Sequence, residues 1–504
     1  MTDKRHMLAS LTARIGLVCG PLAALAITML LPGSYEDSAG ITQELSFATR
    51  AVAGVAMLMA AWWLTEAIPI YATALLPLCL FPLLGIADIR TTASSYGHEI
   101  IFLFMGGFVL ALAIERWGLH QRLALNVLAA VGPRPGAIVG AFMALAAFLS
   151  MWVTNTATTL MLLPVAISVV ALLPALEPDR DGAGSNFTIC LLLGIAYAAS
   201  LGGMGTIIGT APNAFAVSFI KEELGREISF VAWMGFAVPL VCVFVPVVWL
   251  VLTRWVYPLR LVKLEGARTL LRQKKSELTM LSRGELLTLF VFVFTALAWI
   301  TRPLLNELQV GQLQPLEGLS DAGIAIISAM VLFVTPVRLR RGEFLMDWNT
   351  AVRLPWGMLI LFGGGLALAA ALVDTGFNVY LGSLLAGLGD WPEWMIVLLI
   401  VAIIVFLTEM VSNTATTATL VPVVLAVALG AGLPPLFLVL PATLAASCAF
   451  MLPVATPPNA IVFGSGLLRI AQMSRAGIIL NLLAIALITL AAYVMLVPLL
   501  GIEL

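Results

Sequence analysis

Long apolar stretches make up most of the chain, and short polar or charged segments separate them. A helix needs roughly 20 apolar residues to cross a membrane, so the pattern predicts about eleven crossing helices, two of them interrupted. We expect them at about 14–32, 50–66, 68–86, 99–117, 188–220 (interrupted), 231–256, 285–301, 321–337, 353–373, 434–468 (interrupted) and 474–500. The predicted fold class is an all-α polytopic membrane protein.

Two further apolar stretches, at 136–173 and 394–430, are each divided in the middle by a polar motif. The motif is TNTATT at 154–159 in the first stretch and SNTATT at 412–417 in the second. Each half has about 17 residues and is too short to cross a membrane comfortably. We therefore predict two re-entrant helical hairpins, each broken at its polar motif.

The chain repeats itself at an offset of 258 residues. Residues 106–165 align without a gap to 364–423, and the matches concentrate at a Gly-Gly pair, at the Asn-Thr-Ala-Thr-Thr of both motifs and at Pro164 with Pro422. The predicted topology gives the two copies opposite orientations, so the fold is an inverted two-fold repeat. Inverted repeats with broken helices are typical of secondary transporters, which bind substrate at the midplane between the repeats.

The repeat divides the chain into regions that we expect to differ in role. They are 1–97 (scaffold helices 1–3), 98–225 (first half of the transport region), 226–352 (scaffold helices and a cytoplasmic interfacial helix), 353–470 (second half of the transport region) and 471–504 (last transmembrane helix).

Basic residues gather in alternate loops. Eight of them lie between Arg254 and Arg283, others precede the first helix or follow 321–337, and the loop at 374–393 has acidic residues and no base. Because short cytoplasmic loops carry an excess of Lys and Arg, we expect the N-terminus in the cytoplasm and the C-terminus outside a cell (inner) membrane. Residues 262–282 alternate charge and leucine, which predicts an amphipathic helix on the cytoplasmic surface of the lipid bilayer.

Interrupted helices leave unpaired carbonyls at the end of one half and unpaired amides at the start of the next. Carbonyl, hydroxyl and amide oxygens suit a hard cation such as Na⁺, whereas the amide end suits a carboxylate. Ser150 precedes Thr154 by one helical turn, as Thr408 precedes Ser412, so each pair can direct its oxygens at one ion. The prolines of GTAPNA (209–214) and ATPPNA (455–460) break two more helices and free the carbonyls of Gly209 and Ala455.

Charge and composition exclude several functions. The net charge is −1, which gives no electrostatic basis for nucleic-acid binding. Neither an H-E-x-x-H nor a G-x-S-x-G motif occurs, so we expect no enzyme. No Lys or Arg lies between Arg134 and Arg180 or between Arg353 and Arg469. An anionic ligand would have to be balanced by helix dipoles and bound cations, which couples anion binding to Na⁺.

Both polar motifs, both Pro-Asn motifs and AWWLTEAIPI at 61–70 together resemble the divalent anion:sodium symporter (DASS) family over nearly the whole chain. The resemblance implies a homodimer in which a transport domain moves against a scaffold as an elevator. It also implies uptake of C4-dicarboxylates such as succinate, malate and fumarate together with several Na⁺ ions.

The resemblance also implies roles for individual residues. One Na⁺ site would use Ser150, Thr154, Asn155 and the Gly209 carbonyl, and the other Thr408, Ser412, Asn413 and the Ala455 carbonyl. The substrate carboxylates would meet Asn155, Thr156, Asn413 and Thr414, with Thr210, Thr456 and Pro457 lining the pocket. Thr154 stands where the family usually has serine; it keeps the hydroxyl, and its extra methyl narrows the site.

Other interpretations remain open at this point. The same family includes dicarboxylate exchangers and transporters of citrate or sulfate, although the intact hydroxyl pairs favour symport. The paired hairpins of an inverted repeat disfavour an anion channel. Two smaller expectations concern Glu409, which we interpret as facing a water-filled vestibule, and the glycines at 106–107 and 363–365, which we interpret as close-packing positions.

Overall fold

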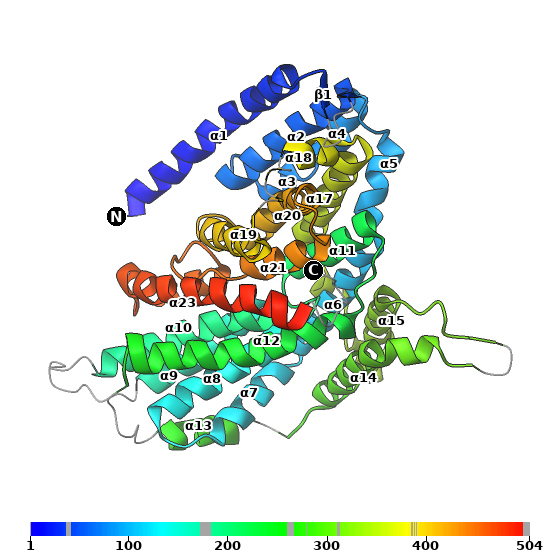
Figure 1. Cartoon of the computed structure of the whole chain (residues 1–504). Coiled ribbons are helices and arrows are strands. Elements are labelled where there is room, and N and C mark those ends of the chain that lie inside the picture. Colours follow the sequence, from blue (N-terminus) through cyan, green and yellow to red (C-terminus); the bar gives the residue numbers. More distant parts are fainter. Residues whose placement is uncertain are drawn as a thin grey trace.

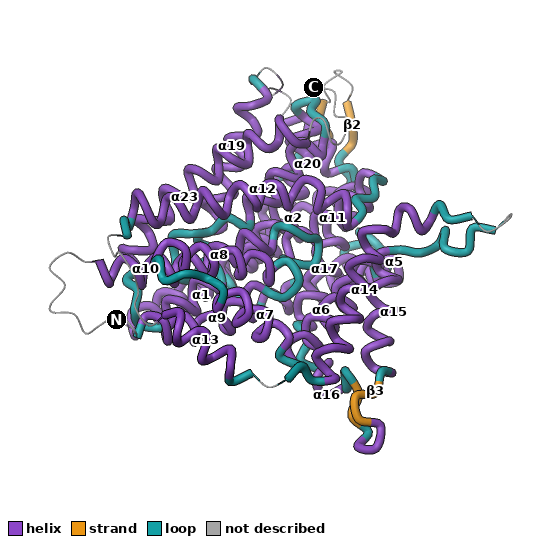
Figure 2. Tube along the Cα trace, turned by 90° about the horizontal axis from the view of Figure 1, so that it is seen from below, coloured by secondary structure: helices purple, strands orange, loops and turns teal. Residues whose placement is uncertain are grey.

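The computed structural model of the protein describes residues 2–36, 42–171, 183–259, 267–278, 280–309, 313–384, 387, 389 and 391–496. Helices form nearly all of it (Figures 1 and 2). Two antiparallel strand pairs, β1 (Ser34–Glu36) with β2 (Thr42–Glu44) and β3 (Pro336–Arg338) with β4 (Glu343–Phe344), lie at the periphery. The all-α polytopic fold predicted from the sequence is confirmed.

The first half of the chain contains α1 (Thr2–Leu30), α2 (Phe47–Thr65), α3 (Ile70–Thr73), α4 (Leu76–Leu83), α5 (Ile89–Ser94), α6 (Glu99–Arg116), α7 (Leu119–Ala129), α8 (Pro135–Ser150), α9 (Asn155–Val170), α10 (Ala183–Gly203), α11 (Ala211–Leu224) and α12 (Phe230–Leu250). The second half contains α13 (Ala267–Ser276), α14 (Arg283–Asn306), α15 (Asp321–Val334), α16 (Trp348–Ala351), α17 (Trp356–Asp374), α18 (Phe377–Leu384), α19 (Glu393–Thr408), α20 (Asn413–Gly430), α21 (Pro435–Ala446), α22 (Pro457–Gly464) and α23 (Ile470–Ala491). π-Helical turns at Val251–Val256 and Ala492–Leu496 extend α12 and α23.

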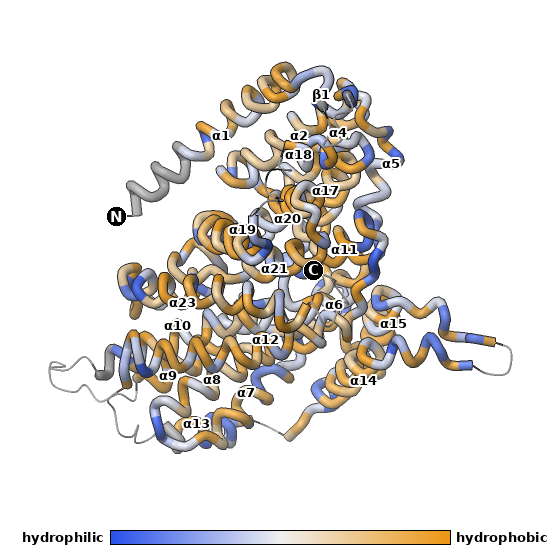
Figure 3. The backbone as a smooth tube through the Cα atoms, viewed as in Figure 1, coloured by the Kyte–Doolittle hydropathy of each residue, from blue (hydrophilic) through white to orange (hydrophobic). Residues whose placement is uncertain are grey.

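Within the described ranges, nine helices are long and apolar enough to cross a membrane. They include α20, the second arm of a hairpin, while three of the expected crossings consist of shorter helices. Hydrophobic residues run along most helices, and hydrophilic ones gather near helix ends (Figure 3). The central helix is α10, which is buried almost throughout, whereas α1 lies at the edge.

Both predicted hairpins are present. The arms of the first are α8 and α9 with a turn at 151–154, and the arms of the second are α19 and α20 with a turn at 409–412. Both interrupted crossings are present as well: α10 and α11 are separated by 204–210, and α21 and α22 by 447–456. Prolines at the start of α11 and α22 explain where the new helices begin, because a proline in the first turn needs no amide partner.

The two halves pack in a reciprocal manner. Each hairpin lies against the first half-helix of its own repeat, α8 and α9 on α10, and α19 and α20 on α21. The second arm of each hairpin then contacts the second half-helix of the other repeat, α9 with α22 and α20 with α11. This exchange of partners is what an inverted two-fold repeat produces at its axis.

The structure differs from the sequence expectation in three elements. The crossing expected at 68–86 is two short helices, α3 and α4, because Pro77 fits the first turn of a new helix and not the interior of one. The crossing expected at 321–337 ends at Val334, two residues before Pro336. The short helix α7 was not anticipated; it lies against α13, a helix inside the segment 262–282 for which the sequence predicts an amphipathic helix on the membrane surface.

Glycines set the closest helix contacts, as the sequence suggested. A Cβ added at Gly106 in α6 would lie 2.5 Å from the backbone carbon of Ala325 in α15. A Cβ at Gly364 in α17 would lie 2.8 Å from the backbone carbonyl carbon of Ala74 and closer still to its oxygen. Small residues therefore let these helices approach backbone to backbone.

Candidate functional site

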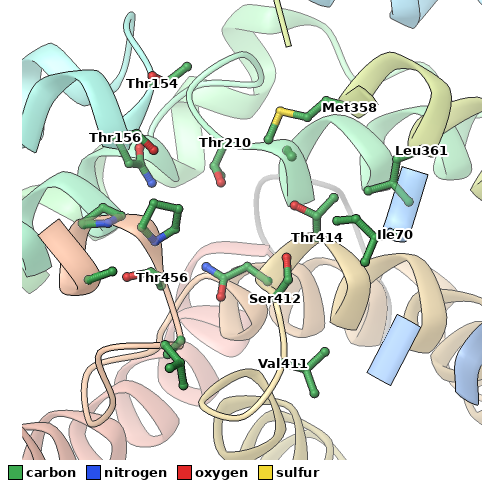
Figure 4. A pocket seen from close by; sticks show the side chains of 18 of the residues that line it. Ile70, Thr154, Thr156, Thr210, Met358, Leu361, Val411, Ser412, Thr414 and Thr456 are labelled. Atoms are coloured by element: carbon green, nitrogen blue, oxygen red, sulfur yellow. The ribbon is translucent and has the colours of Figure 1, made fainter. Parts of the chain in front are cut away.

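The tips of both hairpins and both helix breaks meet around one cavity of about 850 Å³. Thr156, Thr210, Thr414 and Thr456, one from each of these four segments, lie around the same space in Figure 4. The remaining wall comes from residues near the end of α2 and from α1, α3, α6 and α17. Segments separated by more than 250 residues in the chain thus form one site.

The first hairpin is organised by its own polar side chains. The Ser150 hydroxyl, at the end of α8, donates to Asn155 Oδ1, at the start of α9. The Thr154 hydroxyl caps α9 by accepting from the Ala157 amide (3.3 Å). These bonds fix the side chain of Asn155 across the turn and hold the oxygens of Ser150 and Asn155 together.

Gly203, at the end of α10, leaves room for oxygens of Asn155 and Gly209 to approach one another. A Cβ at this position would lie 2.5 Å from Asn155 Oδ1 and 3.1 Å from the Gly209 carbonyl oxygen. Two of the oxygens predicted to bind one cation therefore lie on the same side of a residue that has no side chain. Neutral amide, hydroxyl and carbonyl oxygens are a donor set suited to Na⁺.

The second hairpin repeats the arrangement with one change. The Thr408 hydroxyl is 2.8 Å from Asn413 Oδ1 and 2.9 Å from the Ala446 carbonyl oxygen, which ties the hairpin to the end of α21. Ser412 occupies the N-cap of α20 without forming a side-chain cap. The Ser412 hydroxyl thus accepts no hydrogen bond from the first turn of α20, whereas the Thr154 hydroxyl accepts one from α9.

The Pro-Asn motifs stabilise the two breaks. Asn213 Nδ2 donates to the carbonyl oxygens of Gly203, Met204 and Thr206 at 2.8–3.2 Å. Asn459 Nδ2 donates at 3.1 Å to those of Ala449 and Leu452. Because each asparagine satisfies carbonyls that have lost their helical partners, the irregular backbone is tolerated within the protein.

The predicted site residues fall into two groups. Those that line the cavity are Thr154, Asn155, Thr156, Gly209, Thr210, Ser412, Asn413, Thr414, Ala455, Thr456 and Pro457. Ser150 and Thr408 are fully buried behind it and reach it only through their hydrogen bonds to the two asparagines.

Sequence reasoning missed some functional neighbours. Asn213 and Asn459 belong to the quoted motifs, but their pairing with loop carbonyls had no signal beyond the repetition of the motif. The expectation that Glu409 faces a water-filled vestibule is wrong: only 3% of the residue is exposed, and backbone amides of 450–452 donate to its carboxylate.

The cavity has few charges of its own. Among the described residues that line it, Glu66 is the only Asp, Glu, Lys, Arg or His. The helices α9, α11, α20 and α22 all begin at this cavity, so four positive dipole ends meet there. The geometry therefore suits an anion with more than one carboxylate, provided that cations complete the charge balance.

Comparison with known proteins agrees with this geometry. Residues 13–502 match the family described as the sodium:sulfate symporter transmembrane region. The sodium-dependent dicarboxylate transporter SdcS of Staphylococcus aureus, strains RF122 / ET3-1 and NCTC 8325 / PS 47, is 39% identical over 492 residues, which are 97% of this chain and 92% of SdcS.

The fold also has a solved counterpart. The crystal structure of the YdaH transporter of Alcanivorax borkumensis, described as having an unusual topology, matches with a TM-score of 0.55 at 14% identity. The match covers 98% of each chain. With the family match over nearly all residues, the chain belongs to the divalent anion:sodium symporter family of membrane transport proteins.

Proposed function

We propose that this protein is a Na⁺-coupled symporter of C4-dicarboxylates such as succinate, malate and fumarate. The observation that carries the proposal is one cavity at which two Ser/Thr-Asn hairpin tips and two helix breaks meet, with no Lys or Arg among the described residues that line it. Two hairpin amide ends give one docking point for each carboxylate of the substrate. The relatives named sodium-dependent dicarboxylate transporters support the same substrate class.

Sodium binds, in this proposal, at two places related by the repeat. Ser150, Thr154, Asn155 and the Gly209 carbonyl form the first cation site. Thr408, Ser412, Asn413 and the Ala455 carbonyl form the second cation site. Each asparagine also faces the substrate, so a bound cation orients the amide that meets the carboxylate. Asn155, Thr156, Asn413 and Thr414 hold the carboxylates, and Thr210, Thr456 and Pro457 complete the wall.

Transport proceeds by movement of one rigid body in a homodimer of the inner membrane, with the N-terminus of each chain in the cytoplasm. The mutual contacts of α8–α11 with α19–α22 support such a body, since both hairpins and both broken helices pack on one another. The proposed exit of the C-terminus to the outside concerns residues 497–504, which lie outside the described part of the chain. A native mass of twice the chain mass is the expected result for the dimer.

Uptake of labelled succinate into liposomes tests the proposal. We expect an inward Na⁺ gradient to drive uptake into empty vesicles, because the cation supplies the charge that the cavity lacks. Uptake that needs internal dicarboxylate and ignores Na⁺ would contradict symport and identify an exchanger. Competition by citrate or sulfate in the same assay distinguishes the other substrates of the family.

Two alanine variants localise the site. Asn155→Ala and Asn413→Ala should each reduce uptake by at least about a hundredfold, because a hydrogen bond to a charged group contributes roughly 1.5–3 kcal/mol and cation and anion lose one each. Asn306→Ala is a matched control, since that amide donates to the Leu319 carbonyl and neither residue lines the cavity. Normal uptake by a folded Asn155→Ala or Asn413→Ala protein would remove the proposed site.

A further inference from the structure

Glu409 is a buried carboxylate in the turn of the second hairpin. It follows Thr408 directly and forms the C-cap of α19. The backbone amides of Phe450 and Met451 donate to its Oε1 at 2.6 and 2.8 Å, and that of Leu452 donates to Oε2 at 3.1 Å. Asn481 Nδ2, from α23, donates to Oε1 at 2.8 Å. Four N–H donors match a carboxylate, which only accepts.

The break between α10 and α11 satisfies its backbone amides without a carboxylate. Aligning Gly209 with Ala455 makes Met204 and Gly205 the counterparts of Phe450 and Met451. The Met204 and Gly205 amides donate to the carbonyls of Leu201 and Gly202, so the backbone closes the first break by itself. At the equivalent place in the break between α21 and α22, the amides of Phe450 and Met451 donate to Glu409, so the backbone does not close on itself there.

The counterpart of Glu409 in the first hairpin is a neutral side chain. Met151 has the same position in the repeat, and its methyl group lies 3.0 Å from where a Cβ on Gly205 would be. Met151 and Glu409 thus meet equivalent parts of the two breaks. The two halves therefore differ at this place by one ionisable carboxyl group.

No cationic side chain balances this charge among the described residues. Among the described residues, the hydrogen-bond partners of Glu409 are all neutral amides, and the chain has no Lys or Arg between Arg353 and Arg469. An ionisable residue inside a membrane protein is costly and is usually paired. A cation bound one residue away, beside Thr408, would supply the missing partner.

We propose that Glu409 is a positioning residue that makes the two cation sites unequal. Its carboxylate holds residues 450–452 in the open form that directs the Ala455 carbonyl, and its negative charge strengthens Na⁺ binding at the second cation site relative to the first. The inference rests on the proposed Na⁺ coupling. It adds that Na⁺ occupies the second cation site at lower concentration than the first.

Glu409→Gln tests the charge. The half-saturating Na⁺ concentration for succinate uptake should rise about tenfold or more, because a unit charge at short range in a low dielectric is worth at least that factor. The maximal rate at saturating Na⁺ should change much less. Glu285→Gln is the matched control: Glu285 is the other buried glutamate of the described chain and pairs with Arg122 away from the cavity. It should lower the melting temperature and leave the Na⁺ dependence unchanged.

Asn481→Lys gives a second test that keeps Glu409 and its three backbone donors. The new ammonium would neutralise the carboxylate in place, so the half-saturating Na⁺ concentration should again rise several-fold. Asn481→Leu, which removes the amide donor without adding charge, should leave it within about twofold of the wild type. This pair of variants separates charge from local structure even if Glu409→Gln does not fold.

The outcomes are distinct. A wild-type protein whose uptake ignores Na⁺ would overturn the proposed symport and this inference with it. Na⁺-dependent wild-type uptake, with Glu409→Gln or Asn481→Lys retaining the wild-type half-saturating concentration, would overturn only the role of Glu409. A raised value in these variants, with Glu285→Gln and Asn481→Leu unchanged, would support it.

Discussion

At the scale of single residues, equivalent polar side chains of the two hairpins form different hydrogen bonds. The Thr154 hydroxyl caps α9, whereas the Ser412 hydroxyl makes no cap on α20. Ser150 and Thr408 hold the amides of Asn155 and Asn413 in the same manner, but only Thr408 also reaches a carbonyl of the neighbouring half-helix. Equivalent positions in the repeat therefore need not respond equally to mutation.

Thr154→Val and Ser412→Ala should separate capping from cation binding. Thr154→Val removes the cap and should lower stability by about 1 kcal/mol even without Na⁺. Ser412→Ala removes no cap, so we expect an unchanged melting temperature in Na⁺-free buffer and a higher half-saturating Na⁺ concentration. Thr154→Ser, which keeps the hydroxyl, is the control. Equal destabilisation by Thr154→Val and Ser412→Ala would contradict the assigned difference.

At the scale of elements, helix contacts depend on glycines that permit backbone approach. Gly106→Val and Gly364→Val place methyl groups where the backbones of Ala325 and Ala74 lie. Overpacking of this kind should lower stability by roughly 1–3 kcal/mol or more. Gly235→Ala in α12 is the control, because nothing lies within 4 Å of its added Cβ. Melting curves in detergent would measure both; an unchanged Gly106→Val protein would exclude tight packing of α6 on α15.

A comparison of the elements with the sequence shows which structural features could be predicted and which could not. The hairpins and breaks were predictable because lipid leaves few uses for Thr-Asn-Thr or Pro-Asn in an apolar run, and because the motifs occur twice. The division of 68–86 into α3 and α4 was not predictable, since one long helix and two short ones have the same apolar pattern. The surroundings of Glu409 were not predictable either, because its partners at 450–452 and 481 are distant in the chain.

At the scale of the whole molecule, a junction between repeats should respond to pH. Glu223, at the end of α11 beyond the expected span, has a pKa raised to about 7 by burial and by the negative charges of Asp374 and Glu222. Asp374 ends α17, in the second half of the chain. Deprotonation of Glu223 thus adds a negative charge beside those of Asp374 and Glu222, at a contact between the two halves.

The sign of this effect follows from linkage. The folded-state pKa exceeds the ordinary value of 4.5, so ionisation disfavours the folded protein, and stability falls as pH rises from about 4.5 through about 7. With solvent screening, we expect a loss of about 1–2 kcal/mol. Glu223→Gln should flatten this part of the pH profile, measured as melting temperature against pH. A profile identical to that of the wild type would exclude Glu223 as its source.

The central claim is that one cavity, built from two inverted halves, binds a divalent anion with the help of Na⁺ and without a basic side chain. Equilibrium binding of labelled succinate to the purified protein tests it most directly, first in Na⁺ and then with choline replacing Na⁺ at equal ionic strength. We predict saturable binding in Na⁺ and at least about a thirtyfold loss of affinity in choline, since the helix ends alone do not balance two carboxylates. Equal affinity in both solutions would contradict the account, because the cavity would then bind the anion without the cation.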